Sequence, residues 1–302
     1  MARAGQATLG SVQLEWATVT ECGPHRNENQ DAVLAVPGCF AVADGMGGYE
    51  GGAYASSTTL AAIDAALGRA QGQGVVPETT EAEVNGALAQ AQASIKAVAH
   101  GNPMGSTVTG AALSADGFGL HWLVWHVGDS RLYRFFRGEM SQVTVDHTVV
   151  NELVLTGQLR AWEAARHPDR HVITRAVGMS DSLPADFATL EVRAGEMLLL
   201  CSDGLTGTTD DSLIEAVLRT VDDLSSCARR LVDLAYETGS RDNTSVVLVR
   251  CISGPEGGLA QDGDDLEVTR PRPPQVDDDE APGPGPSDGA SLTTAVIKEV
   301  PE

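Results

Sequence analysis

Apolar runs in this chain repeatedly end at an aspartate that stands beside glycine, asparagine or serine. Four separated segments do so, at Asp31, Asp44, Asp203 and Asp242, and a fifth aspartate, Asp129, has similar neighbours. A strand that ends in this way presents a carboxylate to a cleft, and we expect the four to converge there. Carboxylate oxygens are ligands that Mg²⁺ and Mn²⁺ prefer, and two such ions held together can drive phosphoryl hydrolysis.

The order of the strand and helix signals favours an α+β fold built in layers. Strands are predicted at 12–18, 33–36, 40–43, 107–113, 121–127, 132–136, 197–201 and 245–249. Helices are predicted at 53–67, at 80–98 behind a capping box of Thr80 and Glu83, and around 224–234. Strands do not alternate regularly with helices, so the sheets should be antiparallel. Residues 147–190 are less regular and fit a mobile insertion near a site.

The acidic charge is concentrated at the C-terminal end. The net charge is −22, and residues 253–302 hold 12 acidic and 3 basic residues together with 8 of the 14 prolines. We therefore expect one folded domain at 1–252 and a disordered, acidic tail rich in proline and glycine at 253–302. A chain this acidic is a poor partner for nucleic acid or for an anionic membrane.

The cysteines and the N-terminus bear on location. The five cysteines show no C-x-x-C spacing, which argues against a zinc site or a disulfide framework and favours a reducing cytoplasm. No apolar stretch is typical of a signal peptide or a membrane span. These features predict a cytoplasmic protein, and we expect a monomer.

Each aspartate motif is weak when taken alone. Asp44-Gly-Met-Gly-Gly48 can be an ordinary glycine-rich turn, and Asp203 and Asp242 can cap turns or helices. Arg26, five residues before Asp31, offers a planar fork that matches phosphate. The ordinary explanations account for each motif singly, but they do not account for the occurrence of all of them in one chain.

Taken in order, the motifs resemble those of bacterial metal-dependent protein serine/threonine phosphatases of the type 2C (PPM) family. The resemblance runs from about residue 15 to 249. The matching segments are Gly23-x-x-Arg26-x-x-Asn29-Gln-Asp31, Ala43-Asp-Gly-Met-Gly-Gly48, Gly105-Ser-Thr107, Val127-Gly-Asp-Ser-Arg-Leu-Tyr133, Asp146-His147, His167-Pro168, Ser202-Asp-Gly-Leu205 and Arg241-Asp-Asn-Thr-Ser245.

The resemblance implies a four-layer α-β-β-α sandwich, with two central antiparallel sheets flanked by helices, and a site for two Mn²⁺ or Mg²⁺ ions. Asp44 would bridge the ions, and the carbonyl of Gly45 would bind one of them. Asp31 would serve that same ion, while Asp203 and Asp242 would hold the other.

The resemblance also assigns groups around the two ions. Asp129 would be a ligand of a weaker third ion, and Arg26 would grip the substrate phosphate. Residues 148–190 would include a flap that contacts the phosphoprotein. His147 and His167 are more simply explained as loop or capping residues.

The implied reaction is hydrolysis of phosphoserine and phosphothreonine by a metal-activated water, which reverses the action of a serine/threonine kinase. It needs no phosphoenzyme and no cysteine. Met46 stands where animal members carry a histidine proposed as general acid, so that role has no obvious owner. Tyr49 and Ala53 also depart from the common pattern beside the site. One alternative is a catalytically weak, phosphopeptide-binding regulatory protein; another is a different two-metal hydrolase, which the acidic chain disfavours.

The expected partners are phosphorylated serine/threonine proteins and a cognate serine/threonine kinase. Thr269 and Thr293-Thr294 lie in the predicted tail, where a kinase could modify them. A forkhead-associated-domain protein could then read the phosphothreonine. The simpler interpretation of the tail is a solubilising extension.

Overall fold

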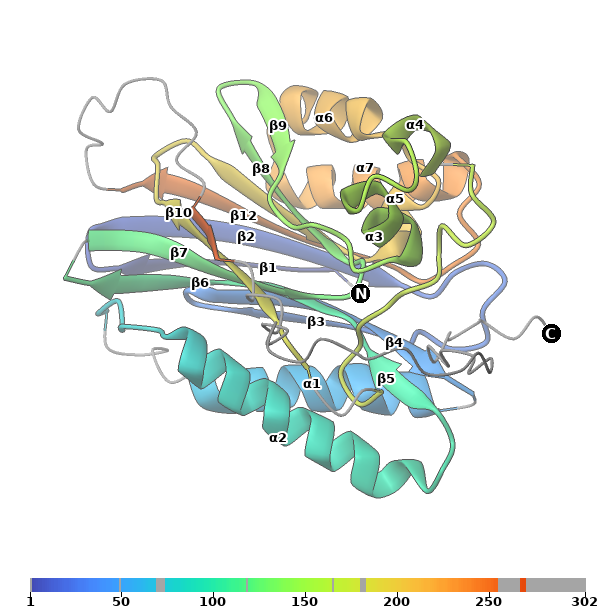
Figure 1. Ribbon diagram of the computed structural model, residues 1–302. Coiled ribbons are helices and arrows are strands. Elements are labelled where there is room, and N and C mark those ends of the chain that lie inside the picture. The colour runs from blue at the N-terminus through green and yellow to red at the C-terminus, as the bar shows by residue number, and fades with distance from the viewer. Residues whose placement is uncertain are drawn as a thin grey trace, which may run out of the picture.

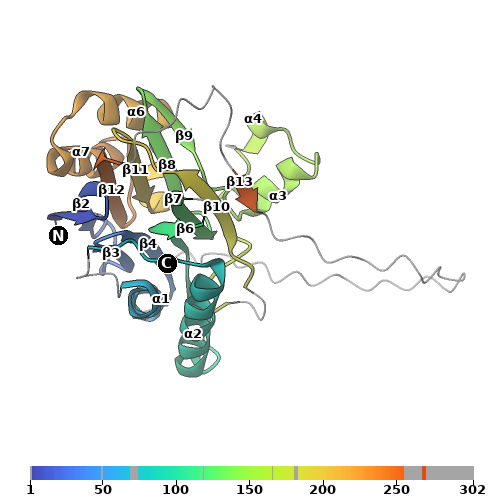
Figure 2. The same ribbon diagram turned by 90° about the vertical axis from the view of Figure 1, so that its left-hand side faces the viewer.

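Two antiparallel sheets lie face to face, with helices on both outer sides (Figures 1 and 2). The structure is a computed structural model that describes residues 2–48, 50–68, 74–117, 119–164, 166–179, 183–254 and 267–269. This arrangement confirms the α+β sandwich that the family resemblance implied.

The first sheet has six strands in the order β1-β2-β12-β11-β8-β9. The strands are β1 (Ala2–Leu9), β2 (Val12–Glu21), β8 (Arg131–Phe136), β9 (Glu139–Gln142), β11 (Met197–Cys201) and β12 (Thr244–Ser253). Asp129, Asp203 and Asp242 all lie just outside the ends of these strands, so this sheet brings together aspartates that are far apart in sequence.

The second sheet has seven strands. Six of them follow the order β13-β10-β7-β6-β4-β3, and β5 pairs with β4. The strands are β3 (Asp31–Val36), β4 (Cys39–Gly47), β5 (Met104–Ser106), β6 (Val108–Asp116), β7 (Gly119–Val127), β10 (Asp186–Glu191) and β13 (Glu267–Thr269). The predicted turn at residues 37–38 joins β3 to β4.

The apolar side chains form three layers of core. Trp16, Phe40 and Trp122 fill the space between the sheets, and the Phe40 ring lies 5.5 Å from Trp16 and 6.3 Å from Trp122. Burial of such large rings is a main source of stability in a sandwich. The Trp16–Phe40 contact joins the two sheets, because Trp16 lies in β2 and Phe40 lies in β4.

Helices cover the outer faces of both sheets. In Figure 1 the helices α1 and α2 lie below the seven-stranded sheet, and α6 and α7 lie above the six-stranded one. Their bounds are α1 (Gly51–Leu67), α2 (Glu81–Ala99), α5 (Asp203–Thr206), α6 (Asp211–Thr220) and α7 (Leu224–Glu237). Two short helices, α3 (Val149–Leu155) and α4 (Ala161–Ala164), stand apart from the sheets (Figure 2).

The helix α2 shows where sequence periodicity succeeds and where it fails. Thr80 and Glu83 form the predicted capping box, and Val84, Leu88, Ala91 and Ile95 are buried as predicted. The sequence also predicts Val98 on the same stripe of this helix, but Val98 is 46% exposed. A seven-residue apolar repeat drifts by about 20° per heptad on a straight helix, which turns the last position away from the core.

Residues 186–190 belong to β10, so the segment outside the sheets ends earlier than the predicted flap. We use "the flap" below for residues 148–185, between β9 and β10. No helix in the described residues is long and apolar enough to span a membrane. Most of the predicted tail, including Thr293-Thr294, lies outside the described residues, as does Tyr49. Three tail residues, Glu267–Thr269, pair with β10 as β13.

Candidate metal centre

Asp31 and Asp44 are direct neighbours on adjacent strands. Asp31 is the first residue of β3 and pairs in register with Asp44 of β4. The amide of Asp44 donates to Thr107 Oγ1 at 3.0 Å, and its carbonyl accepts from Ser106 Oγ at 3.0 Å. Antiparallel pairing places directly opposed side chains within about 5 Å. The first two predicted ligands therefore share one edge of the seven-stranded sheet.

Gly45 follows Asp44 at a point where the backbone is crowded. A Cβ at Gly45 would lie 2.0 Å from the carbonyl oxygen of Gly52 and 2.6 Å from that of Gln30. Only glycine fits this contact, which explains the residue type on packing grounds alone. The predicted role of its carbonyl as a metal ligand stays a prediction.

Asp203 and Asp242 come from the six-stranded sheet. Asp203 begins α5 directly after β11, and Asp242 lies two residues before β12. Ser202 joins this side to β3, because its hydroxyl donates to Asp31 Oδ2 at 2.8 Å and accepts from the amide of Ser245 at 3.0 Å. These contacts join the two sheets where β3 begins and β11 ends.

Arg26 lies beside Asp242. Arg26 Nη2 donates to Asp242 Oδ2 at 2.7 Å, and the Asp242 Oδ1 atom accepts from the amide of Asn243 at 2.7 Å. The Arg26 loop is held close by Gly23, where a Cβ would lie 2.3 Å from the carbonyl oxygen of Asp242. The predicted phosphate-binding group and one predicted metal ligand thus bind each other in this structure.

Asp129 lies in the connection between β7 and β8. The next arginine, Arg131, makes a two-pronged contact with Asp146, with Nε–Oδ1 at 2.9 Å and Nη2–Oδ2 at 2.7 Å. This fork anchors the start of β8 to the segment that leads into the flap. Asp129 therefore lies between β7 and a start of β8 that Arg131 anchors to Asp146.

The five aspartates repel one another electrostatically. Burial raises the pKa of Asp44 well above its ordinary value, and the charges of Asp31, Asp203, Asp242 and Asp129 raise it further. Burial and the charge of Asp242 raise the pKa of Asp31 to about 6, against the opposing effect of hydrogen bonds from Ser245 and Ser202. A set of close carboxylates with raised pKa values is typical of a functional site.

The residues fit a hard divalent cation. Asp31 Oδ1 is buried and accepts no hydrogen bond from the described residues, and a carboxylate oxygen in that state is costly unless a cation reaches it. No three carboxylate, imidazole or thiol groups in the described residues are placed to enclose one ion by themselves. An ion there would also need water or backbone carbonyl ligands, which Mg²⁺ and Mn²⁺ commonly have.

Sequence reasoning assigned no role to two hydroxyl residues that position the aspartates. Thr107 Oγ1 accepts from the Asp44 amide and bonds Ser130 Oγ at 2.7 Å, and Ser202 bonds Asp31 as described above. Thr107 and Ser202 both lie inside the matched motifs, and this was the one sequence feature that could have indicated their positioning role. Their short side chains do not distinguish them from ordinary turn residues.

Other residues singled out from the sequence lie around the site or away from it. Met46 lies in β4, two residues after Asp44, and Ala53 lies in α1. His167 is on the flap, bonded to the amide of Asp169. Trp162, on α4 of the flap, is 66% exposed, whereas the other three tryptophans are buried.

Comparison with known proteins decides the family. Residues 25–242 match the family described as protein phosphatase 2C. The chain belongs to this family. The matched span includes Arg26 and all five aspartates, so the phosphatase 2C resemblance expected from the motifs is confirmed.

Individual phosphatase 2C relatives agree with this assignment. The serine/threonine protein phosphatase PstP of Mycobacterium tuberculosis is 32% identical over 268 residues, which are 86% of this chain and 51% of PstP. The chain therefore spans about half the length of that relative. The protein phosphatase PhpP of Streptococcus pneumoniae is 32% identical over 244 residues, which are 78% of this chain and 97% of PhpP.

A solved phosphatase 2C structure is also similar. It is the catalytic domain of the serine/threonine protein phosphatase PstP in complex with two manganese ions. The match has a TM-score of 0.68 and 30% sequence identity, and covers 80% of this chain and 99% of that one. The similarity supports a metal-dependent site in this fold.

Proposed function

We propose that this chain hydrolyses phosphoserine and phosphothreonine in proteins, and so reverses the action of a cognate serine/threonine kinase. The observation that carries the proposal is the gathering of five aspartates beside Arg26 in a chain of the phosphatase 2C family. The relatives PstP and PhpP are named as phosphatases, which favours hydrolysis over the alternative of a weak phosphopeptide-binding protein.

Asp31, Asp44, Asp203, Asp242 and the Gly45 carbonyl would hold two Mn²⁺ or Mg²⁺ ions, and Asp129 would contribute to a weaker third. Bound cations would lower the pKa of water and neutralise charge on the phosphate. The protein would hold these ligands in position: Thr107 holds the Asp44 backbone, and Ser202 orients Asp31. Arg26 would present its planar fork to the phosphate oxygens.

The four buried cysteines are poorly suited to a covalent route. Burial raises the pKa of Cys39 and Cys201 to about 12 and that of Cys227 and Cys251 to about 11, so these thiols are protonated near neutral pH. A protonated thiol is a poor nucleophile. All five cysteines are free in the described residues, which is consistent with the proposed cytoplasmic location.

The exposed flap supports a protein substrate in preference to a small phosphate ester. Trp162 and Leu155 are both exposed there, at 66% and 58%. Apolar groups beside a polar site can contact the residues that flank a phosphorylated side chain. A forkhead-associated-domain protein that reads the tail remains part of the proposal. Its candidate residue Thr269 has a described backbone in β13, whereas Thr293-Thr294 lie outside the described residues.

The first test is Mn²⁺-dependent release of phosphate from phosphothreonine and phosphoserine peptides. We expect turnover that requires the metal and that also appears with p-nitrophenyl phosphate at millimolar Mn²⁺. Peptide binding without any turnover of either substrate would favour the binding-protein alternative.

Two substitutions of Arg26 should distinguish the contribution of its positive charge from that of its planar, two-pronged shape in binding the phosphate. We expect Arg26→Ala to lower kcat/KM for a phosphothreonine peptide by about a hundredfold, because a charged donor to the reacting phosphate is lost. Arg26→Lys keeps the charge but loses the fork, so it should fall between alanine and wild type.

The matched control for Arg26 is Arg230→Ala. Arg230 is an arginine on α7 that pairs with Glu237, and its loss should leave kcat/KM unchanged. Wild-type kcat/KM in Arg26→Ala would remove Arg26 from the proposed site.

A further inference from the structure

His147 binds the backbone of Gly128 at two points. The amide of His147 donates to the Gly128 carbonyl at 2.7 Å, and the amide of Gly128 donates to His147 Nδ1 at 3.0 Å. The His147 side chain is buried, with 5% of the residue exposed. A neutral imidazole that accepts at Nδ1 carries its proton on Nε2. The geometry therefore selects one tautomer of His147.

The other side of the His147 ring faces an ion pair at the end of the flap. His147 Nε2 lies 3.3 Å from Asp186 Oδ2 and 3.2 Å from Arg175 Nη1. Arg175 Nη1 also donates to Asp186 Oδ1 at 2.8 Å, so Asp186 is the acceptor that both groups share. Burial alone would raise the pKa of Asp186, but the hydrogen bonds from His147 and Arg175 and the charge of Arg175 hold it below its ordinary value. An ionised carboxylate at this position favours the Nε2–H tautomer.

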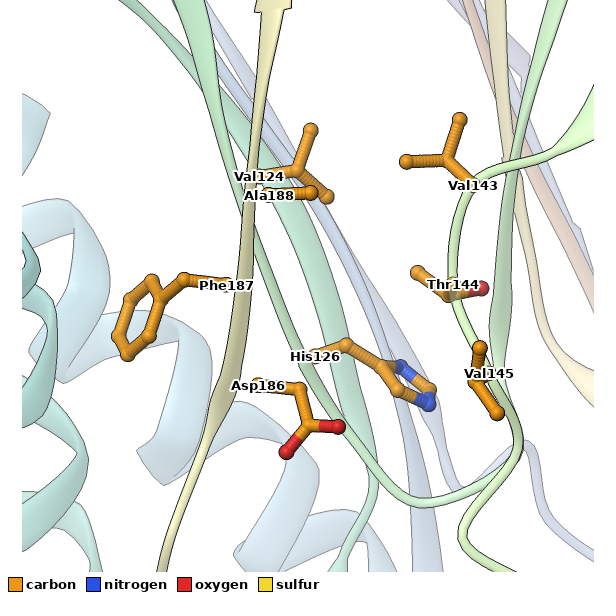
Figure 3. A pocket seen from close by; sticks show the side chains of 8 residues that line it. All are labelled: Val124, His126, Val143, Thr144, Val145, Asp186, Phe187 and Ala188. Atoms are coloured by element: carbon orange, nitrogen blue, oxygen red, sulfur yellow. The ribbon is translucent and has the colours of Figure 1, made fainter. Parts of the chain in front are cut away.

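A second histidine packs against the ring. The ring of His126, on β7, lies 4.7 Å from that of His147 and is inclined by 37°. Burial lowers the pKa of His126 to about 3, so it adds no charge beside His147 near neutral pH. In Figure 3, His126 points toward Val145 across a cavity of about 20 Å³ that Asp186 also lines. Close packing on this side limits rotation of the His147 ring.

Gly128 connects this arrangement to the aspartates. Its φ is +103°, and a Cβ there would lie 2.6 Å from Thr107 Cγ2. Thr107 in turn accepts from the Asp44 amide, and Asp129 is the next residue in the chain. A group that holds Gly128 therefore holds the backbone that leads into Asp129.

His147 also closes the neck of the flap. Its carbonyl accepts from the Thr174 amide at 2.8 Å, and the following residue, Thr148, bridges to Ile173. The start of the flap thus pairs with its residues 173–174 at the residue that binds Gly128.

We propose that His147 is a positioning residue that couples the flap to Asp129, with Asp186 fixing the ring so that Nδ1 holds the Gly128 amide. The role rests on the proposed function, because Asp129 matters only if the site works as described there. It differs from the loop or capping role that the sequence favoured for His147.

The experiment uses the full chain without metal and measures amide hydrogen exchange at Gly128 by NMR. His147→Asn retains an acceptor near the position of Nδ1, whereas His147→Gln retains reach toward Asp186 but loses that acceptor. We expect Gly128 exchange to be at least about tenfold faster in the glutamine variant and close to wild type in the asparagine variant. The Leu199 amide, in the centre of β11, should stay protected in both and reports that the fold is intact.

A second readout keeps the proposal testable if His147→Gln does not fold. The ¹⁵N spectrum of the wild-type His147 ring should show the Nε2–H tautomer, and Asp186→Asn should increase the fraction of the other tautomer and speed Gly128 exchange. In the Mn²⁺-loaded enzyme, His147→Gln should also need about tenfold more Mn²⁺ for half-maximal peptide hydrolysis, while His167→Gln, a flap histidine away from Gly128, should not.

Wild-type exchange at Gly128 in His147→Gln would overturn the proposal, as would equal acceleration in the asparagine and glutamine variants. An Nδ1–H tautomer in the wild-type protein would overturn it as well. The hydrogen-exchange and tautomer measurements do not depend on catalytic turnover. If the protein hydrolysed no substrate, the proposed function would be refuted, and these measurements would still test the role of His147.

Discussion

Replacing Asp44 by asparagine is expected to stabilise the metal-free protein at pH 8 and to remove its activity. The pKa of Asp44 is raised by burial and by four neighbouring aspartates. A carboxyl whose pKa is higher in the folded state costs stability once the pH rises above its unfolded value, near 4, and the full cost is reached above the folded value. We expect Asp44→Asn to raise the free energy of unfolding at pH 8.

The measurement is thermal or urea unfolding in a chelator at pH 8 and at pH 4. The gain should shrink toward pH 4, where the folded wild-type carboxyl is protonated and the unfolded one is about half protonated. Addition of Mn²⁺ should stabilise the wild type by mass action and the variant much less. Asp233→Asn, at an exposed aspartate on α7, should change neither curve. A metal-free Asp44→Asn protein that is less stable than wild type at pH 8 would contradict the electrostatic account.

Acid should destabilise the protein through His126. Burial lowers the folded pKa of His126 to about 3, while an unfolded histidine titrates near 6.5. Between about pH 6.5 and pH 3, His126 is therefore protonated in the unfolded state but neutral in the folded state. The free energy of unfolding falls as the pH is lowered through this range. Relative to a variant without this group, the wild type should lose about 3 kcal/mol between pH 7 and pH 4.

The comparison is urea unfolding of wild type and His126→Asn across that pH range. The quantity to compare is the difference in the free energy of unfolding between the two proteins at each pH. The buried aspartates titrate in both proteins, and their raised pKa values make the folded state more stable as the pH falls. The difference should grow steadily below pH 6.5. Parallel stability curves down to pH 4 would show that His126 does not stay neutral in the folded protein.

Much of the fold follows from local patterns in the sequence. Alternation predicted β2, and Thr80 with Glu83 predicted the start of α2. β1 was missed because Ala2–Leu9 is made mostly of small residues, and its pairing with β2 supplies what its own propensity lacks. β10 was missed for a similar reason: Asp186–Glu191 lies beyond an irregular segment, and its pairing with β7 is long-range.

The candidate site divides in the same way. The motifs identified Arg26 and the aspartates because they occur together and in one order. The structure places the five aspartates close enough to interact electrostatically, with Arg26 bound to Asp242. Their roles as ligands stay predictions. Spacing could not reveal that Arg26 binds Asp242, or that His147 is buried against Gly128. Both contacts join segments that are close only after the flap and the sheets have formed.

The most direct test of the metal centre compares Mn²⁺-dependent phosphate release from a phosphothreonine peptide by wild type, Asp203→Asn and Asp242→Asn. Asparagine keeps the size of each side chain but removes the charge that a divalent cation needs. We expect both variants to be at least about a hundredfold slower than wild type while remaining folded. Equal rates in all three proteins would contradict the account.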